Sequence, residues 1–241
     1  MADAAPSPGS DLLAAAMDQG LAAGCALLFG GQGYLYFEEL QALWADEGSH
    51  AVLTAIAAAL AEELASAEGV KAAAWPLGLD LVGWLESPAD RPSIPYLCSA
   101  PVSYPLVFAC QLANYVVTLQ RTGCAHADFI PTVKGATGHS QGVVAAAVVA
   151  SAATDADLIT RAALGAKYML WQGTRCHEVL NASVRYTGTT PQSSPMLAVT
   201  GLGEAALRKV SVLCSCSTHG LPSSTMGLIT SGCVQIRWWT R

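Results

Sequence analysis

One short motif in the sequence has the residue types and spacing of a serine nucleophile. Gly138-His139-Ser140-Gln141-Gly142 matches the pattern G-x-S-x-G. In this pattern a serine lies on a sharp turn between a strand and a helix, where its hydroxyl is exposed and the helix N–H groups can stabilise an oxyanion. The simpler alternative is a glycine-flanked helix start with Ser140 as an ordinary N-cap. The motif therefore makes Ser140 a candidate for covalent catalysis.

A second glycine-rich loop, "GGQG" at 30–33, follows a short apolar run. A serine on such a turn needs another backbone donor, which a loop of this kind supplies. A phosphate-binding turn is the alternative, but the loop lacks both the lysine of a P-loop and the G-x-G-x-x-G spacing. The combination of the two loops favours a serine nucleophile with an oxyanion hole.

The elements expected around these loops alternate between strands and helices, which predicts an α/β fold. Proline, glycine and the apolar periodicity predict strands at 25–29 and 132–137, and helices at 12–23, 36–67 with a break at 46–50, 101–123, 143–153 and 155–179. A further strand is expected at 195–201. We divide the chain into a leader and helix (1–22), a core (23–194), the start of a small subdomain (195–210) and a divergent tail (211–241).

Composition excludes several classes of protein. Apolar residues make up 52% and charged residues 12% of the chain, so a large core can form. The net charge of −6, without a basic block, argues against nucleic-acid binding, and the longest apolar run is too short to span a membrane. The N-terminus lacks the features of a secretory signal, and the eight cysteines lie mostly in apolar surroundings. These features predict a cytoplasmic protein with reduced thiols.

Several longer segments carry a family resemblance. "LLFGGQG", "YLCSAPVSYPLVFACQLANYVVT", "KGATGHSQGVVAAAV", "GTRCHEVLNAS" and "SPMLAVTGL" occur in this order. Over about residues 25–205 the chain resembles the N-terminal acetyltransferase, or starter unit acyltransferase, domain of the fungal-type fatty acid synthase β subunit. Polyketide synthase starter domains and malonyl transacylases are related to it. The resemblance implies an acyltransferase (FabD-like) core with a short parallel sheet flanked by helices, and the incomplete start of a ferredoxin-like subdomain.

The resemblance also implies a reaction and its residues. Ser140 would take an acyl group from acyl-CoA as an ester and pass it to the phosphopantetheine thiol of an acyl carrier protein. The backbone N–H groups of Gln32 and Gln141 would form the oxyanion hole, and His139 would shape the turn beside the substrate pocket. The chain would need no metal or other cofactor of its own, and would work with other domains of a fatty acid or polyketide megasynthase.

A substrate preference follows from one position of the resemblance. Malonyl-transferring relatives have an arginine where this chain has Gln172, and that arginine pairs with the malonyl carboxylate. A neutral amide cannot form this bidentate, charge-assisted pair. We therefore expect a short neutral acyl group, most simply acetyl. Arg175 lies three residues further on and is a second candidate for the pocket.

The general base is missing from the predicted site. The family places its catalytic histidine well downstream of the serine, and here the family pattern is lost after about Lys209. We expect His50 and His126 to be surface residues, His177 to line the pocket or the core, and His219 to have no role. The expected consequence is impaired turnover, with residues 211–241 derived from a truncated or mis-spliced gene product.

Three alternatives stay open. The chain could be an inactive fragment with an interaction role, or a serine hydrolase or thioesterase that uses the same turn. A metal cluster of Cys214, Cys216, His219 and Cys233 is the third, although its spacing is poor for zinc.

Overall fold

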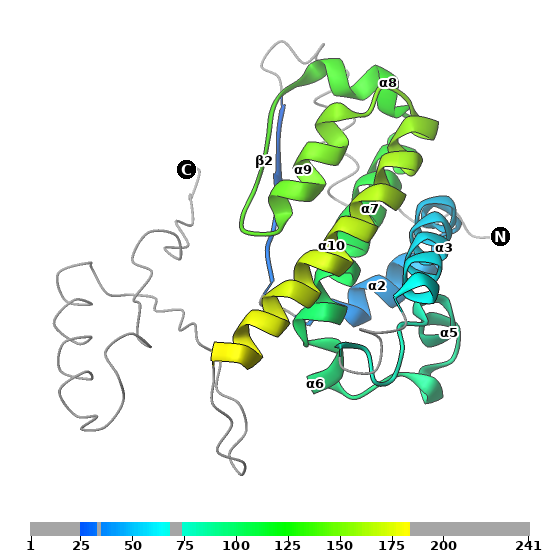
Figure 1. Cartoon of the computed structure of the whole chain (residues 1–241). Coiled ribbons are helices and arrows are strands. Elements are labelled where there is room, and N and C mark those ends of the chain that lie inside the picture. Colours follow the sequence, from blue (N-terminus) through cyan, green and yellow to red (C-terminus); the bar gives the residue numbers. More distant parts are fainter. Residues whose placement is uncertain (1–24, 33–34, 68–73, 184–241) are drawn as a thin grey trace, which may run out of the picture. The chain divides into compact units, whose positions relative to one another are not determined.

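A computed structural model describes residues 25–32, 35–67 and 74–183, all within one compact unit, Met1–Arg185 (Figure 1). The predicted helix at 12–23, the predicted strand at 195–201 and the tail at 211–241 lie outside the described residues. The described part is mostly helical. In chain order its elements are β1 (Cys25–Phe29), α2 (Phe37–Trp44), η1 (Glu47–Ser49), α3 (His50–Ser66), α5 (Leu81–Glu86), η2 (Pro88–Asp90), α6 (Ile94–Leu97), α7 (Ala100–Arg121), α8 (His126–Phe129), η3 (Ile130–Thr132), β2 (Val133–Gly138), α9 (Gly142–Ser151) and α10 (Asp155–Ser183).

The two described strands form a parallel pair. β1 and β2 run in register from Ala26 opposite Gly135 to Phe29 opposite Gly138, with an irregularity at the Cys25 end. α9 packs against both strands, as Figure 1 shows. Because the strands are parallel, their carboxyl ends lie side by side. The loop after β1 and the turn after β2 therefore meet at one edge of the sheet, and the α/β organisation expected from the sequence is confirmed. A FabD-like core stays a prediction.

α7 is the central core helix. Proline at its second residue, Pro101, and Gly123 at φ +67° just beyond its end account for its limits. By length and composition α7 could cross a membrane. However, 78% of its most apolar 18-residue stretch is buried inside the domain, as in the core helix of a globular domain.

Glycines allow α10 to lie close to α7. A Cβ on Gly165 would lie 2.6 Å from the ring of Phe108, and a Cβ on Gly173 would lie 2.3 Å from the Ala100 carbonyl oxygen. These contacts fix α10 along α7, so that the Gln172 stretch lies at the N-terminal end of α7.

His126 corrects an expectation from the sequence. We expected a surface residue, but His126 is fully buried at the start of α8. Its Nδ1 lies 2.8 Å from the Tyr115 hydroxyl, and its Nε2 lies 3.0 Å from the carbonyl oxygen of Ala152. The ring joins α7, α8 and the end of α9, so its position is explained by packing.

The cysteine thiols in the described part differ in their exposure to solvent. Cys110 is buried, whereas Cys98 and Cys176 are exposed.

Candidate active site

Ser140 lies on a strained turn between β2 and α9. Its φ is +53°, the left-handed value that a non-glycine residue adopts rarely, and it is the one such residue in the described part of the chain. The N–H of Gly142 donates to the His139 carbonyl (2.9 Å), and the N–H of Val143 donates to the Ser140 carbonyl (3.3 Å). The turn holds Ser140 at the N-terminal end of α9 with the residue exposed to solvent. This is the geometry of a nucleophile elbow.

Both glycines of the motif are required by close backbone contacts. A Cβ on Gly138 would lie 2.0 Å from the carbonyl carbon of Gly142. A Cβ on Gly142 would lie 2.2 Å from the Gly30 carbonyl oxygen and 2.4 Å from the Phe29 carbonyl oxygen. Real Cβ atoms do not approach backbone this closely. The turn and its contact with the glycine loop therefore both require glycine, which has no side chain, at positions 138 and 142.

The glycine loop lies directly against the serine. The N–H of His139 donates to the Phe29 carbonyl (2.9 Å), which extends the contact between the strands into the turn. A Cβ on Gly31 would lie 2.8 Å from the His139 carbonyl oxygen and 3.1 Å from the Ser140 Cβ. Backbone from two loops therefore meets beside the Ser140 side chain, which is the arrangement that an oxyanion hole requires.

Gln141 is placed to contribute to this site through its backbone. Its side chain is buried (4% exposed), and neither amide atom has a hydrogen-bond partner among the described residues. The hydrogen bonds of the turn use the N–H groups of Gly142, Val143 and Val144 but not that of Gln141. The first N–H groups of a helix have no intrahelical acceptor and carry the positive end of the helix dipole. They can therefore stabilise negative charge at Ser140.

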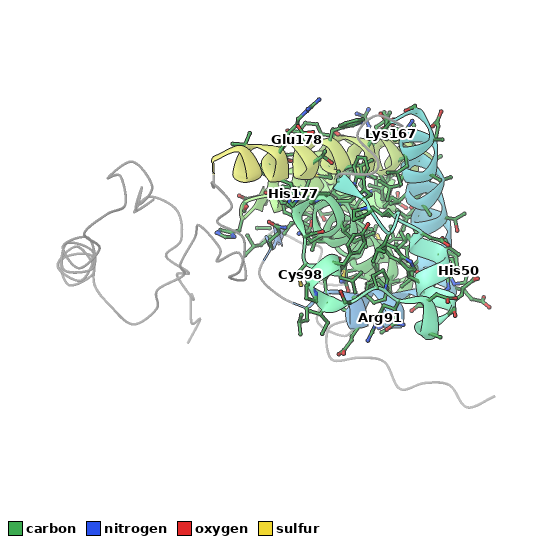
Figure 2. All side chains as sticks on the ribbon, turned by 60° about the horizontal axis from the view of Figure 1, so that its bottom comes forward. His50, Arg91, Cys98, Lys167, His177 and Glu178 are labelled. Atoms are coloured by element: carbon green, nitrogen blue, oxygen red, sulfur yellow. The ribbon has the colours of Figure 1, made fainter. Side chains whose placement is uncertain are left out.

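Three of the histidines in the described part have different surroundings. A Cβ on Gly31 would lie 2.9 Å from Nδ1 of His139, so this ring lies against the glycine loop. His50 is exposed and stacks on Trp44 with 4.4 Å between the ring centres, as the sequence predicted for a surface position. His177 is half-buried on α10 and lies on the opposite side of the domain from His50 in the view of Figure 2. His219 lies outside the described residues.

The two predicted pocket residues on α10 have different surroundings. Gln172 is half-buried, and its Oε1 is buried without a hydrogen-bond partner among the described residues. The guanidinium of Arg175 is exposed, pairs with Glu178 at 2.5 Å and lies 5.7 Å from the centre of the Trp171 ring. Figure 2 shows Glu178 on the α10 ribbon. The charge of Arg175 is thus partly compensated by Glu178 at the surface. The side-chain oxygen of Gln172, in contrast, is a buried hydrogen-bond acceptor without a donor among the described residues.

The N-terminal turns of α7 complete this end of the domain with neutral groups. The hydroxyl of Tyr104 donates to Cys176 Sγ at 3.9 Å, and burial together with Cys176 raises the pKa of Tyr104 to about 12. The phenol is therefore protonated and uncharged at neutral pH. A Cβ on Gly173 would lie 3.0 Å from Tyr104 Cβ, so the Gln172 stretch and Tyr104 are neighbours.

Sequence reasoning missed two side chains that contact the glycine loop, Ser103 and Gln111 of α7. Gln111 Nε2 donates to the Gly30 carbonyl, and Gln32 Nε2 donates to Ser103 Oγ at 2.5 Å. The available signal was the presence of a serine and a glutamine within the mostly apolar stretch 101–113.

A cavity of about 330 Å³ lies between β1 and α7, but Ser140 is not among its lining residues. It is lined by Leu27, Leu28, Phe29, Gly30, Gln111, Asn114, Tyr115, Thr118, Leu119 and Phe129. Of these residues Gly30 belongs to the glycine loop, so the cavity borders this loop without including Ser140. Within residues 25–32, 35–67 and 74–183 no group of three or more histidine, cysteine or acidic side chains could hold a metal ion. The cysteines of the alternative cluster lie outside these ranges.

Comparisons with a family model and with individual known proteins agree on one family. The family model described as "Starter unit:ACP transacylase in aflatoxin biosynthesis" matches residues 27–231, which is most of the chain and extends beyond Lys209. The fatty acid synthase beta subunit aflB of Emericella nidulans is 36% identical over 188 residues, which are 76% of this chain and 9% of that protein. The fatty acid synthase subunit beta of Saccharomyces cerevisiae is 33% identical over 194 residues, 73% of this chain and 9% of that protein.

A third relative, the fatty acid synthase beta subunit TOXC of Cochliobolus carbonum, is 32% identical over 221 residues. That alignment covers 85% of this chain and 10% of TOXC, so the chain spans about a tenth of the length of these curated relatives. The extent of the family match and the agreement among the relatives support the resemblance seen in the sequence. The chain belongs to the starter unit:ACP transacylase family and is similar to the corresponding part of fungal fatty acid synthase β subunits.

Proposed function

We propose that this domain transfers a short neutral acyl group, most simply acetyl, from CoA through an ester on Ser140 to an acyl carrier protein. The observation that carries the proposal is the exposed Ser140 at φ +53° with the glycine loop packed against it. A strained, exposed serine between two sets of backbone donors fits acyl transfer better than it fits an N-cap. Other domains of a cytoplasmic fatty acid or polyketide megasynthase would supply the carrier protein.

The proposed reaction has two halves. In the first, Ser140 Oγ loses its proton to a base and attacks the thioester carbonyl, and the resulting oxyanion accepts hydrogen bonds from the N–H groups of Gln32 and Gln141. The C–S bond then breaks, CoA leaves as the thiol after taking up a proton, and the acyl group stays on Ser140. In the second half, the phosphopantetheine thiol of the carrier gives its proton to the base and its sulfur attacks the ester carbonyl. The C–O bond to Ser140 then breaks, the acyl group leaves as a thioester of the carrier, and Ser140 Oγ recovers its proton.

The general base of this reaction is not assigned to His126 or His50. His126 is buried in contacts with Tyr115 and Ala152, and His50 stacks on Trp44. We infer that neither serves Ser140, and we expect slow acylation if no other residue of the chain takes this role. Loss of one member of a nucleophile–base unit costs several orders of magnitude in rate. A chain with this defect would act as an inactive fragment.

The first test is an acyl adduct on Ser140. The chain is incubated with acetyl-CoA, its intact mass is measured over time, and the modified peptide is located by fragmentation. We expect one acetyl group on Ser140, and none in Ser140→Ala. Transfer of the group to an added carrier protein supports the transferase, whereas release to water supports the hydrolase. A folded chain that never acquires the adduct contradicts the proposed function and supports the inactive fragment instead.

A second test concerns the choice of acyl group. We expect Gln172→Arg to raise the ratio of malonyl to acetyl adduct on Ser140 by about 10-fold, because a guanidinium pairs with a carboxylate and an amide does not. Arg175→Gln is the matched control, since Arg175 is paired with Glu178 at the surface and its loss should leave the ratio unchanged. The ratio is measured by intact mass with an equimolar mixture of the two thioesters. An effect of Arg175→Gln as large as that of Gln172→Arg would contradict the assignment of Gln172.

A further inference from the structure

We propose that Gln111 and Ser103 of α7 are positioning residues that hold the glycine loop, residues 30–32, in the orientation that the oxyanion requires. The catalytic part of this inference rests on the proposed function. Both residues are almost fully buried, at 8% and 4% exposed, on a helix whose other buried positions are mostly apolar. Burying a polar side chain costs free energy unless it forms hydrogen bonds, so their partners indicate what they do.

Both partners belong to the glycine loop. Gln111 Nε2 donates to the carbonyl of Gly30, and Ser103 Oγ accepts from the side-chain amide of Gln32 at 2.5 Å. The Oε1 of Gln111 is buried without a hydrogen-bond partner among the described residues, so the bond to Gly30 is the contact that offsets burial of this amide. The loop is therefore attached to α7 on either side of Gly31, the residue that lies against Ser140.

These attachments restrict the rotation of the peptide planes in the loop. The Gly30 carbonyl and the Gly31 N–H belong to one peptide plane, and a flip of this plane would reverse both groups. Glycine makes such a flip cheap, because it adopts positive φ without a steric penalty. The bond from Gln111 opposes the flip at Gly30, and the bond to Ser103 fixes the side chain of Gln32, whose N–H is the proposed donor. A donor that points elsewhere loses its contribution to catalysis.

The chain contains a matched control on the same helix. Gln120 Nε2 donates to the Gly48 carbonyl at 3.0 Å, so it is also a glutamine amide bonded to a glycine carbonyl. Its partner lies in η1 rather than in the glycine loop. Gln111→Met and Gln120→Met remove a glutamine–carbonyl bond with the same replacement, although the Gln111 amide is buried and the Gln120 amide is exposed. Only the first touches the loop beside Ser140.

The experiment measures loop protection and acylation in the full chain. Hydrogen exchange followed by mass spectrometry reports on peptides that cover residues 29–32 and 46–49, and intact mass gives the rate of Ser140 acylation against acetyl-CoA concentration. We expect Gln111→Met to raise exchange at 29–32 and to lower the maximal acylation rate about 10- to 100-fold, with the half-saturating concentration unchanged. Gln120→Met should raise exchange at 46–49 alone and leave the acylation rate near that of the unmodified chain.

The possible results separate this inference from the proposed function. Unchanged exchange at 29–32 in Gln111→Met would overturn the inference whatever the chain does with acetyl-CoA. Raised exchange with an unchanged acylation rate would overturn the catalytic part of it, as would equal slowing by both variants. If the unmodified chain is not acylated, the proposed function and the catalytic part both fail, while exchange still decides whether Gln111 holds the loop. Ser103→Ala should produce the same pattern as Gln111→Met, with a smaller change.

Discussion

Gly31→Ala is expected to slow acylation of Ser140 by about 100-fold or more, whereas Gly30→Ala should change the rate by less than about threefold. The added Cβ at Gly31 would lie 2.8 Å from the His139 carbonyl oxygen and 3.1 Å from the Ser140 Cβ, so the loop has to move away from the serine. A Cβ at Gly30 meets nothing within 4 Å. Two adjacent glycines therefore differ in whether they face the nucleophile.

The acylation rates of both variants and of the unmodified chain are measured by intact mass in samples quenched at successive times after addition of acetyl-CoA. Thermal unfolding of each variant is measured in parallel, to show that any loss of rate comes from the loop and not from an unfolded domain. The interpretation of the loop as part of an oxyanion site fails if Gly31→Ala is acylated as fast as Gly30→Ala while both are folded.

Gly142→Ala is expected to lower the free energy of unfolding by about 3 kcal/mol or more, because the Cβ would overlap backbone that has little freedom to move. It would lie 2.2 Å from the Gly30 carbonyl oxygen and 2.4 Å from the Phe29 carbonyl oxygen, where α9 crosses the end of β1. Gly135→Ala is the control in the preceding strand. Its Cβ meets nothing within 4 Å, and alanine there should be neutral or stabilising by up to about 1 kcal/mol, since it restricts the unfolded chain.

Urea unfolding monitored by tryptophan fluorescence gives both differences from the transition midpoints. A Gly142→Ala variant with the stability of Gly135→Ala would contradict the close contact between the turn and the glycine loop.

The sequence predicted the parts of the site that depend on neighbours along the chain. A run of apolar residues followed by glycines is enough to predict β1 and its loop, and the G-x-S-x-G spacing is enough to predict the strand, turn and helix around Ser140. The burial of His126 depends on Tyr115 and Ala152, which lie in other elements. The roles of Ser103 and Gln111 depend on a loop more than seventy residues away. Such contacts leave no local pattern, and only the fold brings them together.

The parallel pairing of β1 with β2 has a consequence for how the domain folds. Ala26 pairs with Gly135, so the two halves of the site come from segments more than a hundred residues apart in the chain. Such a pairing pays the entropy of closing a long loop before it gains contacts, and it slows folding. During synthesis at about 5–20 residues per second, the glycine loop would wait several seconds or longer for the strand that leads to Ser140. Acylation of Ser140 would therefore report that β1 and β2, which are synthesised far apart in time, have paired in the folded domain.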